Sequence, residues 1–154
     1  MRHGSRAVAA LIAAPVLLAA TPAPAPQPTG PGGKVSLDVT GLRNAKGQVL
    51  ACLTAKPKAF PDCSKDPAAR TAVVAAAASV RIEFGHVPAG RYAISLIHDE
   101  NSNRKMDMAI MMPKEGYGFS RNAPVSFGPP KFDKAAFDVI GSDVEQQAKM
   151  RYLL

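Results

Sequence analysis

Residues 35–40 read Val35-Ser36-Leu37-Asp38-Val39-Thr40, a stretch in which apolar and polar side chains alternate. This period of two is typical of a strand that buries one face and exposes the other to water. The same alternation returns at 80–84 and again at 92–96. The chain is therefore predicted to consist mainly of strands with one buried face each.

Short segments rich in glycine, proline and asparagine separate these stretches, as at 44–47 and 86–90. They are typical of turns, and the first predicts that the strands on either side of it pair as a hairpin. The alanines of 71–78 favour a helix, but threonine and valine in the same run lead us to interpret it as a strand. The prediction is an all-β, antiparallel, seven-stranded β-sandwich of immunoglobulin-like type, with a small helix near 132–137 and strands at 35–40, 48–54, 71–78, 80–84, 92–96, 137–139 and 147–154.

The first 20 residues have the features of an export signal. Arg2 and Arg6 give a basic start, and the uncharged run Ala7–Ala20 follows. As a helix that run would extend roughly 21 Å, less than the ~30 Å hydrocarbon core of a bilayer. We expect residues 1–20 to be a cleaved signal peptide rather than a retained anchor or a buried helix. The mature chain is then expected to have no transmembrane segment and to be periplasmic or secreted.

Residues 21–33, TPAPAPQPTGPGG, alternate proline with other residues and end in glycines. Proline-rich sequence favours an extended, semi-rigid spacer without a core of its own. We expect this segment to be a linker and residues 34–154 to form a single β-sandwich domain, which is a usual domain size.

The basic residues are scattered rather than clustered. The chain has 19 lysines and arginines against 12 acidic residues, and removal of Arg2 and Arg6 lowers the net charge from +7 to +5. Nucleic-acid-binding domains usually group basic and aromatic side chains on one face, and this chain has no tryptophan. We therefore expect no nucleic-acid partner, and instead a solvated basic surface attracted to anionic envelope components.

Cys52 and Cys63 are the two cysteines of the chain. An even number of cysteines in an exported protein predicts a disulfide, because export delivers the thiols to an oxidising compartment. Redox-active pairs usually follow the much shorter Cys-x-x-Cys spacing. We expect a structural disulfide between the second strand and the 57–67 loop, in preference to free thiols or metal ligands.

Oxygen-bearing side chains alternate at Asp99, Asn101 and Asn103, and another follows at Asp107. These stand at positions 1, 3, 5 and 9 of a calcium-type loop, and the main-chain carbonyl of Lys105 stands at position 7. Alternate oxygens allow a short loop to curl around one hard cation.

Two features of the same segment depart from calcium loops. Arg104 stands where glycine is usual, and Ile110 stands where an acid would close the site. Asparagine and aspartate also stabilise turns by bonding to their own backbone. We predict such a turn, without a cofactor, and keep a weak calcium site as the alternative.

A long connection without a clear strand pattern runs from 98 to 130. Connections of this length are usually binding loops. Tyr117, Phe119 and Phe127 would line a shallow apolar patch or fold back as a lid on the sandwich. The residues expected to contact a ligand are His98, Glu115, Tyr117, Phe119 and Ser120.

His98 shares the parity of Ile94 and Leu96, so it is expected to enter this connection from the core side. A neutral imidazole there would anchor backbone groups of the loop. In an alternative, His98 with Asp99 or another nearby carboxylate is the base of a small periplasmic hydrolase. The sequence contains no recognised nucleophile elbow, so we predict no enzymatic activity.

Three segments resemble a bacterial family catalogued as domain of unknown function 2141: PAGRYAISLIHDENSNRKMD (88–107), PKEGYGFSRNA (113–123) and FGPPKFDKAAF (127–137). The resemblance covers roughly residues 35–154. It implies an exported, transthyretin-like or carboxypeptidase-regulatory-like β-sandwich with no established activity. Members commonly have glycines in the Asn-rich loop, where this chain has Ser102 and Arg104.

We predict an exported, non-catalytic β-sandwich module that binds an unknown protein, glycan or envelope ligand through the 98–130 connection. A calcium-stabilised form of the same module is the first alternative, and the hydrolase is the second.

Overall fold

A computed structural model describes residues 31–154 and shows a mostly β chain, as predicted. The predicted signal peptide and residues 21–30 of the predicted linker lie outside the described residues. Within 31–154, no helix has the length and apolar character needed to cross a bilayer. The strands are β1 (Gly32–Thr40), β2 (Gln48–Thr54), β3 (Arg70–Ala75), β4 (Ser79–Pro88), β5 (Gly90–Asp99), β6 (Met108–Ala109), β7 (Met112–Pro113), β8 (Gly116–Phe119), β9 (Phe137–Val139) and β10 (Val144–Lys149), and the helical segments are η1 (Ser120–Asn122) and α1 (Phe132–Ala135).

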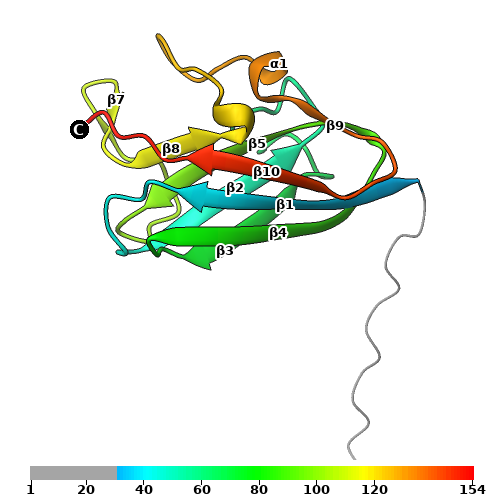
Figure 1. Cartoon of the computed structure of the whole chain (residues 1–154). Helices are drawn as coiled ribbons and strands as arrows, with labels where there is room; N and C mark the ends of the chain where they lie inside the picture. Colours follow the sequence, from blue (N-terminus) through cyan, green and yellow to red (C-terminus); the bar gives the residue numbers. More distant parts are fainter. Residues whose placement is uncertain (1–30) are drawn as a thin grey trace, which may run out of the picture.

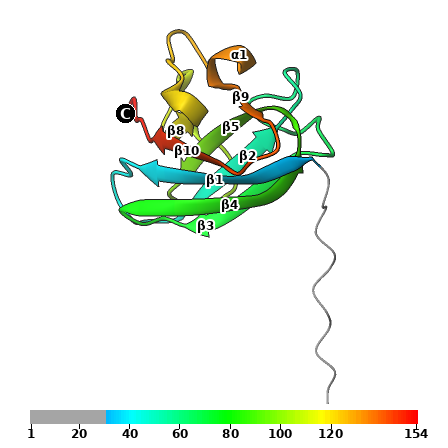
Figure 2. The same ribbon diagram turned by 45° about the vertical axis from the view of Figure 1, so that its right-hand side comes forward.

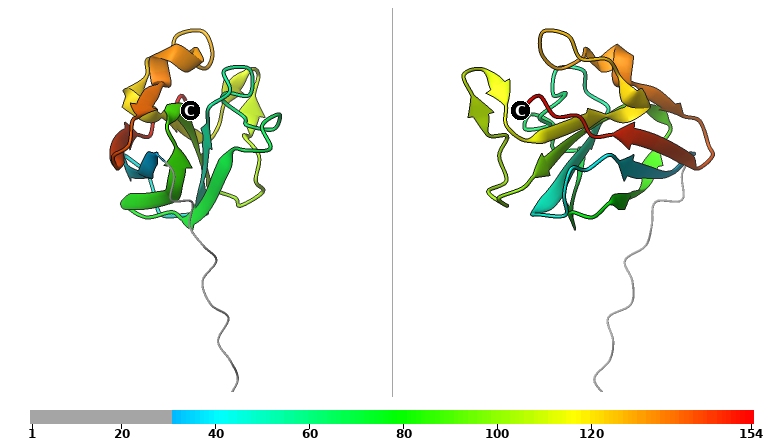
Figure 3. Two further views of the ribbon diagram at one scale, coloured as in Figure 1. Left: turned by 90° about the vertical axis from the view of Figure 1, so that its right-hand side faces the viewer. Right: turned by 60° about the vertical axis from the view of Figure 1, so that its left-hand side comes forward.

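The strands form two main sheets that lie one over the other (Figures 1 and 2). The smaller sheet has the order β10-β1-β4, and the larger has the order β3-β2-β5-β8 with β9 also paired to β5. β6 and β7 form a separate two-stranded hairpin. This hairpin projects at the end of the molecule where the chain terminates (Figures 1 and 3).

The main core lies between the two sheets. Val35, Leu37 and Val39 of β1 are fully buried there, which confirms the face predicted from the alternation. Ile94 and Leu96 of β5 meet them from the larger sheet. Because each buried aliphatic side chain contributes about 1.5–3 kcal/mol by leaving water, the packing of these two faces holds the sheets together.

The predicted hairpin of strands 35–40 and 48–54 is wrong. β1 pairs with β4 and β10, whereas β2 pairs with β3 and β5 in the other sheet. The 41–47 connection therefore crosses from one sheet to the other. Alternation specifies which face of a strand is buried, and both arrangements bury the same face, so the periodicity does not select the pairing partner.

The prediction of a wholly antiparallel fold is also wrong. β1 and β10 run parallel, from Val35 opposite Val144 to Thr40 opposite Lys149. β10 ends at Lys149, so most of the strand expected at 147–154 lies beyond it. Three strands that the prediction did not include, β6, β7 and β8, lie within the 98–130 connection.

β1 begins at Gly32, inside the segment predicted to be a linker. A Cβ atom at Gly32 would collide with the carbonyl oxygen of Val87, and one at Gly33 would collide with that of Ser142. These glycines therefore allow close approach of neighbouring backbone, as glycine often does in strands. The glycine-rich composition of this segment had instead indicated the end of a linker.

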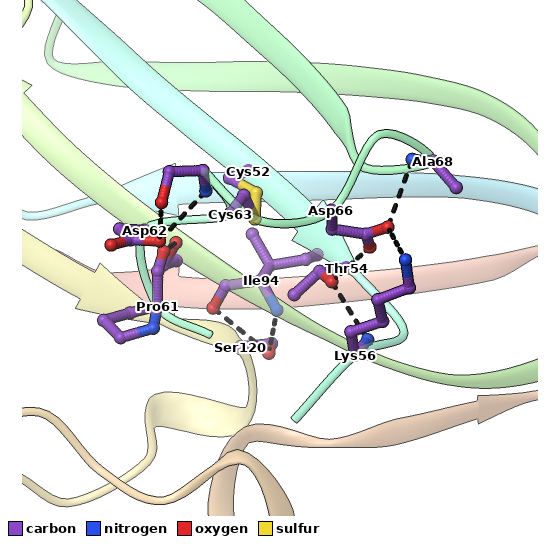
Figure 4. The surroundings of a disulfide bond; sticks show 12 residues. Cys52, Thr54, Lys56, Pro61, Asp62, Cys63, Asp66, Ala68, Ile94 and Ser120 are labelled. Carbon is purple, nitrogen blue, oxygen red and sulfur yellow. Dashed lines mark hydrogen bonds and ion pairs between the residues drawn. A yellow bond between two sulfur atoms is a disulfide. The ribbon is translucent and has the colours of Figure 1, made fainter. Parts of the chain in front are cut away.

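Cys52 and Cys63 form the predicted disulfide, with their Cα atoms 6.4 Å apart (Figure 4). Nearby, the buried Asp66 carboxylate accepts a hydrogen bond from the Thr54 hydroxyl at 2.6 Å. It also lies 3.1 Å from the Lys56 ammonium. The 55–69 loop is thus fixed to β2 by the disulfide and the Thr54–Asp66 hydrogen bond, and the Lys56–Asp66 ion pair lies within the loop itself.

A second apolar cluster lies beside β8 and α1. The ring of Phe60, from the 55–69 loop, lies 5.7 Å from that of Phe119 and 6.0 Å from that of Phe132, centroid to centroid. Tyr117 belongs to the same cluster. The disulfide loop and the second half of the long connection therefore support each other.

Candidate functional site

The residues predicted to contact a ligand gather around β5 and β8, but their side chains face inward. His98 and Ser120 are fully buried, and Glu115, Tyr117 and Phe119 are 4–7 % exposed. The rest of the described chain therefore covers these side chains almost completely in this structure. They can therefore support the exposed residues of the 98–130 connection by packing and hydrogen bonding.

His98, near the end of β5, has hydrogen-bond partners for both ring nitrogens. Nε2 lies 2.8 Å from the main-chain carbonyl oxygen of Lys46, and Nδ1 lies 2.7 Å from the Tyr152 hydroxyl. Because a carbonyl only accepts, Nε2 carries the proton, and in the neutral ring Nδ1 then accepts from the tyrosine hydroxyl. The ring thus anchors the 41–47 connection and the C-terminal segment to β5, whereas the sequence predicted that it would anchor backbone groups of the 98–130 connection.

Arg43 completes this junction from the surface side. Its guanidinium binds both carboxylate oxygens of Glu100 at 2.7 Å and lies 4.6 Å from the centre of the Tyr152 ring. It also donates to the carbonyl oxygens of Lys114, at 3.0 Å, and of Leu154. The hydrogen bonds from Arg43 lower the pKa of Glu100 to about 2. The pair therefore stays ionised at neutral pH and fixes the chain terminus beside the long connection.

Ser120 has structural partners rather than a catalytic one. Its hydroxyl donates to the carbonyl oxygen of Ala135 at 2.6 Å and accepts the Ile94 N–H at 2.9 Å. These bonds join η1, α1 and β5. Among the hydrogen bonds of the described residues, none links His98 to a serine, threonine or cysteine side chain.

The Asn-rich loop curls around its own side-chain oxygens. Asp99 accepts the N–H groups of Asn103 at 3.0 Å and Arg104 at 2.7 Å. The Asn101 oxygen accepts the Asn103 N–H, and the Asn103 oxygen accepts the Lys105 N–H at 2.8 Å. Arg104, with φ of 62°, adopts the left-handed conformation for which calcium loops usually have glycine. The predicted turn is therefore present.

Asp107 and Glu115 close the loop from its far side. The Asp107 carboxylate accepts the amide groups of Asn101 at 2.6 Å and Asn103 at 3.0 Å. Glu115 accepts the Asp107 N–H at 3.1 Å through Oε2, whereas its buried Oε1 has no hydrogen-bond partner. Burial raises the pKa of Glu115, and the negative charges of Asp99 and Asp107 raise it further.

As folded here, no three His, Cys, Asp or Glu side chains of residues 31–154 converge on one metal position. Asp107 is turned toward asparagine amides, and Ile110, at the place of the terminal acid, lies outside the loop and is 95 % exposed. The sequence pattern missed Glu115 because it lies beyond the linear span of a calcium loop. A search for acids after the next turn signal would have found it.

Between Asp107 and Glu115 the chain forms the two-stranded β6–β7 hairpin, which we term the apolar hairpin (residues 108–113). Ile110 and Met111, at its turn, are 95 % and 91 % exposed, and both have positive φ. A branched side chain such as isoleucine is rarely found there. Met108 and Met112 are exposed beside them. The run MAIMMP inside a polar connection was the available sequence signal for this surface.

Cations flank the apolar hairpin on both sides in sequence. Arg104 and Lys105 precede it, Lys114 follows it, and none of the three is buried. None of them takes part in the ion pairs found among residues 31–154. The acids at its base, Asp107 and Glu115, are half-buried and buried, whereas the three cationic side chains are exposed.

Comparison with known proteins places the chain in a family without assigning it an activity. Searches of curated proteins and of solved structures found no match. A family model described as "Uncharacterized protein conserved in bacteria (DUF2141)" matches residues 37–147, which confirms the resemblance seen in the sequence. The matched part includes β8, the Asn-rich loop and the apolar hairpin. The chain is a member of this bacterial family, domain of unknown function 2141.

Proposed function

We propose that the protein is an exported, non-catalytic β-sandwich module that docks on an anionic lipid surface of the bacterial envelope through the apolar hairpin. The observation that carries the proposal is the nearly complete exposure of Ile110 and Met111 at the turn. Exposed apolar patches of this kind usually mark interaction sites. The disulfide supports export, because such bonds persist in oxidising compartments.

Absence of catalysis is supported by the partners of the polar side chains. Both ring nitrogens of His98 are engaged, and the Ser120 hydroxyl bonds to backbone groups. A general base needs a nucleophile or a bound water within reach. These two side chains instead hold the 41–47 connection, the C-terminal segment, η1 and α1 against β5.

A lipid surface is favoured over a protein or glycan by the combination of side chains. Ile110 and Met111 present apolar groups at the turn, where they can enter the region between headgroups and acyl chains. Arg104, Lys105 and Lys114 lie near its base, where they can meet anionic headgroups at about 1 kcal/mol each. Such a surface supports reversible, peripheral binding.

The variant Ile110→Asp is expected to weaken binding to anionic vesicles by at least about 30-fold. The change removes an aliphatic side chain whose burial in the bilayer would contribute about 2–3 kcal/mol to the free energy of binding. It also adds a negative charge that anionic lipids repel. The measurement is flotation of the processed protein with vesicles of phosphatidylglycerol and phosphatidylcholine, compared with pure phosphatidylcholine vesicles.

Ile140→Asp is the matched control, because Ile140 is 82 % exposed and follows β9 at the opposite end of the molecule (Figures 1 and 3). It should bind as the unmodified protein does. Equal loss in both variants, or no preference for anionic vesicles in the unmodified protein, contradicts the proposal. Binding to a protein or glycan instead would contradict the choice of a lipid.

A further inference from the structure

Glu115 is a buried carboxylate whose oxygens are incompletely satisfied. It is 4 % exposed, Oε2 accepts the main-chain N–H of Asp107, and Oε1 has no partner. Buried polar atoms without partners are rare, and such an atom in a native fold indicates a missing ligand or water. The bond to the Asp107 N–H places Glu115 beside the Asn-rich loop.

The carboxylates around this loop also lack a cationic partner. The ion pairs of residues 31–154 join Arg43 to Glu100, but none includes Asp99, Asp107 or Glu115. Asp99 is fully buried and Asp107 is half-buried. Buried charges are costly unless they are paired or coordinate a metal ion. Asp99 is held by hydrogen bonds from Gln48 and from backbone N–H groups, and no cationic side chain of residues 31–154 neutralises the three carboxylates of this small region.

We propose that this loop binds one calcium ion through oxygen atoms of Asp99, Asn101, Asn103, Asp107, Glu115 and the main-chain carbonyl of Lys105. The donors are all oxygen and their number matches the six to eight that calcium takes. Zinc is disfavoured because it prefers nitrogen and sulfur ligands. Glu115 supplies the acid that Ile110, in the linear pattern, does not.

The hydrogen bonds within the loop are compatible with calcium binding. An amide or carboxylate oxygen has more than one lone pair, so it can accept a backbone N–H and also ligate an ion. The amide nitrogens of Asn101 and Asn103 now face Asp107, and binding requires these amides to turn so that oxygen faces the ion. Asp107 is then released to become a ligand.

Calcium would thereby join the two ends of the apolar hairpin. Asp107 directly precedes β6, and Glu115 follows β7 after Lys114. The Lys114 N–H already donates to the Asp107 carbonyl oxygen at 2.9 Å. A calcium ion bound by both Asp107 and Glu115 would hold the two ends of the apolar hairpin together more firmly. Ion binding itself does not depend on the proposed lipid surface, so either proposal can fail alone.

The test is calorimetry of the processed protein without lipid, after treatment with chelator. Addition of calcium chloride to about 10 mM is expected to raise Tm by about 5–10 °C, with a Kd of roughly 0.1–1 mM, as in extracellular calcium modules. Magnesium at the same concentration should raise Tm much less. Isothermal titration calorimetry should give one calcium ion per chain.

Asp107→Asn and Glu115→Gln should each reduce the calcium-induced shift in Tm by more than half. The matched control is Asp62→Asn, because Asp62 is an exposed aspartate that caps the backbone N–H of Ser64 in the 55–69 loop. Its calcium shift should equal that of the unmodified protein. Equal Tm with calcium and with chelator, and no heat of binding, in the folded unmodified protein would overturn the proposal whether or not the variants fold.

Discussion

Replacement of His98 by alanine is expected to lower the free energy of unfolding by about 3–5 kcal/mol. The change opens a cavity under β5, where a large buried side chain typically contributes several kcal/mol. It also leaves the Tyr152 hydroxyl and the Lys46 carbonyl oxygen without their partner, at about 1–3 kcal/mol for each group that stays dry. Urea unfolding followed by circular dichroism measures the change.

Tyr152→Phe separates the two contributions, because it removes the hydroxyl, with its bonds to His98 and to the Arg43 N–H, and keeps the ring. It should cost about 1–2 kcal/mol. Phe127→Ala, at a fully exposed aromatic side chain, should change stability by less than about 0.5 kcal/mol. A loss below about 1 kcal/mol for His98→Ala would show that the ring is not the structural anchor described above.

Loss of the disulfide is expected to lower the free energy of unfolding by about 2–3 kcal/mol. Cys52 and Cys63 are separated by 11 positions, and closing a loop of that size removes about this much chain entropy from the unfolded state. The double variant Cys52→Ser/Cys63→Ser and the reduced unmodified protein should give the same value in guanidinium unfolding. The Thr54–Asp66 bond and the Phe60 ring should keep the 55–69 loop in place.

Reductant provides the control for this second prediction. It should shift the unfolding midpoint of the unmodified protein and leave that of the double variant unchanged. If reductant changes neither midpoint and the variant is as stable as its parent, the disulfide does not stabilise the fold.

The sequence predicted local features well because they depend on neighbouring residues. The alternation at Val35–Val39 correctly identified the buried face, and the even number of cysteines correctly indicated the disulfide between Cys52 and Cys63. The pairing of β1 with β4 and β10 was not predictable from that alternation, since it depends on which apolar faces meet across the core. The same limit applies to the parallel arrangement of β1 and β10.

In the candidate site, too, contacts between neighbouring residues were predictable from the sequence and contacts between distant residues were not. The turn formed by Asp99 and Asn103 was predictable, because these side chains bond to backbone a few residues away. The approach of Glu115 was not, since the apolar hairpin separates it from the loop in sequence and brings it back in space. Ile110 was assigned to a loop position by counting, although the hairpin turn carries it into solvent.

The most direct test of the proposed docking surface uses tryptophan as a reporter, because the chain has none. The variant Met111→Trp places the reporter at the hairpin turn, and Ile140→Trp serves as the control at the opposite end. With phosphatidylglycerol-containing vesicles, emission from the Met111→Trp variant should shift to shorter wavelength and be quenched by lipids brominated on their acyl chains. Emission from the Ile140→Trp variant should not change. Unchanged emission from both variants, or equal quenching of both, would contradict insertion of the apolar hairpin.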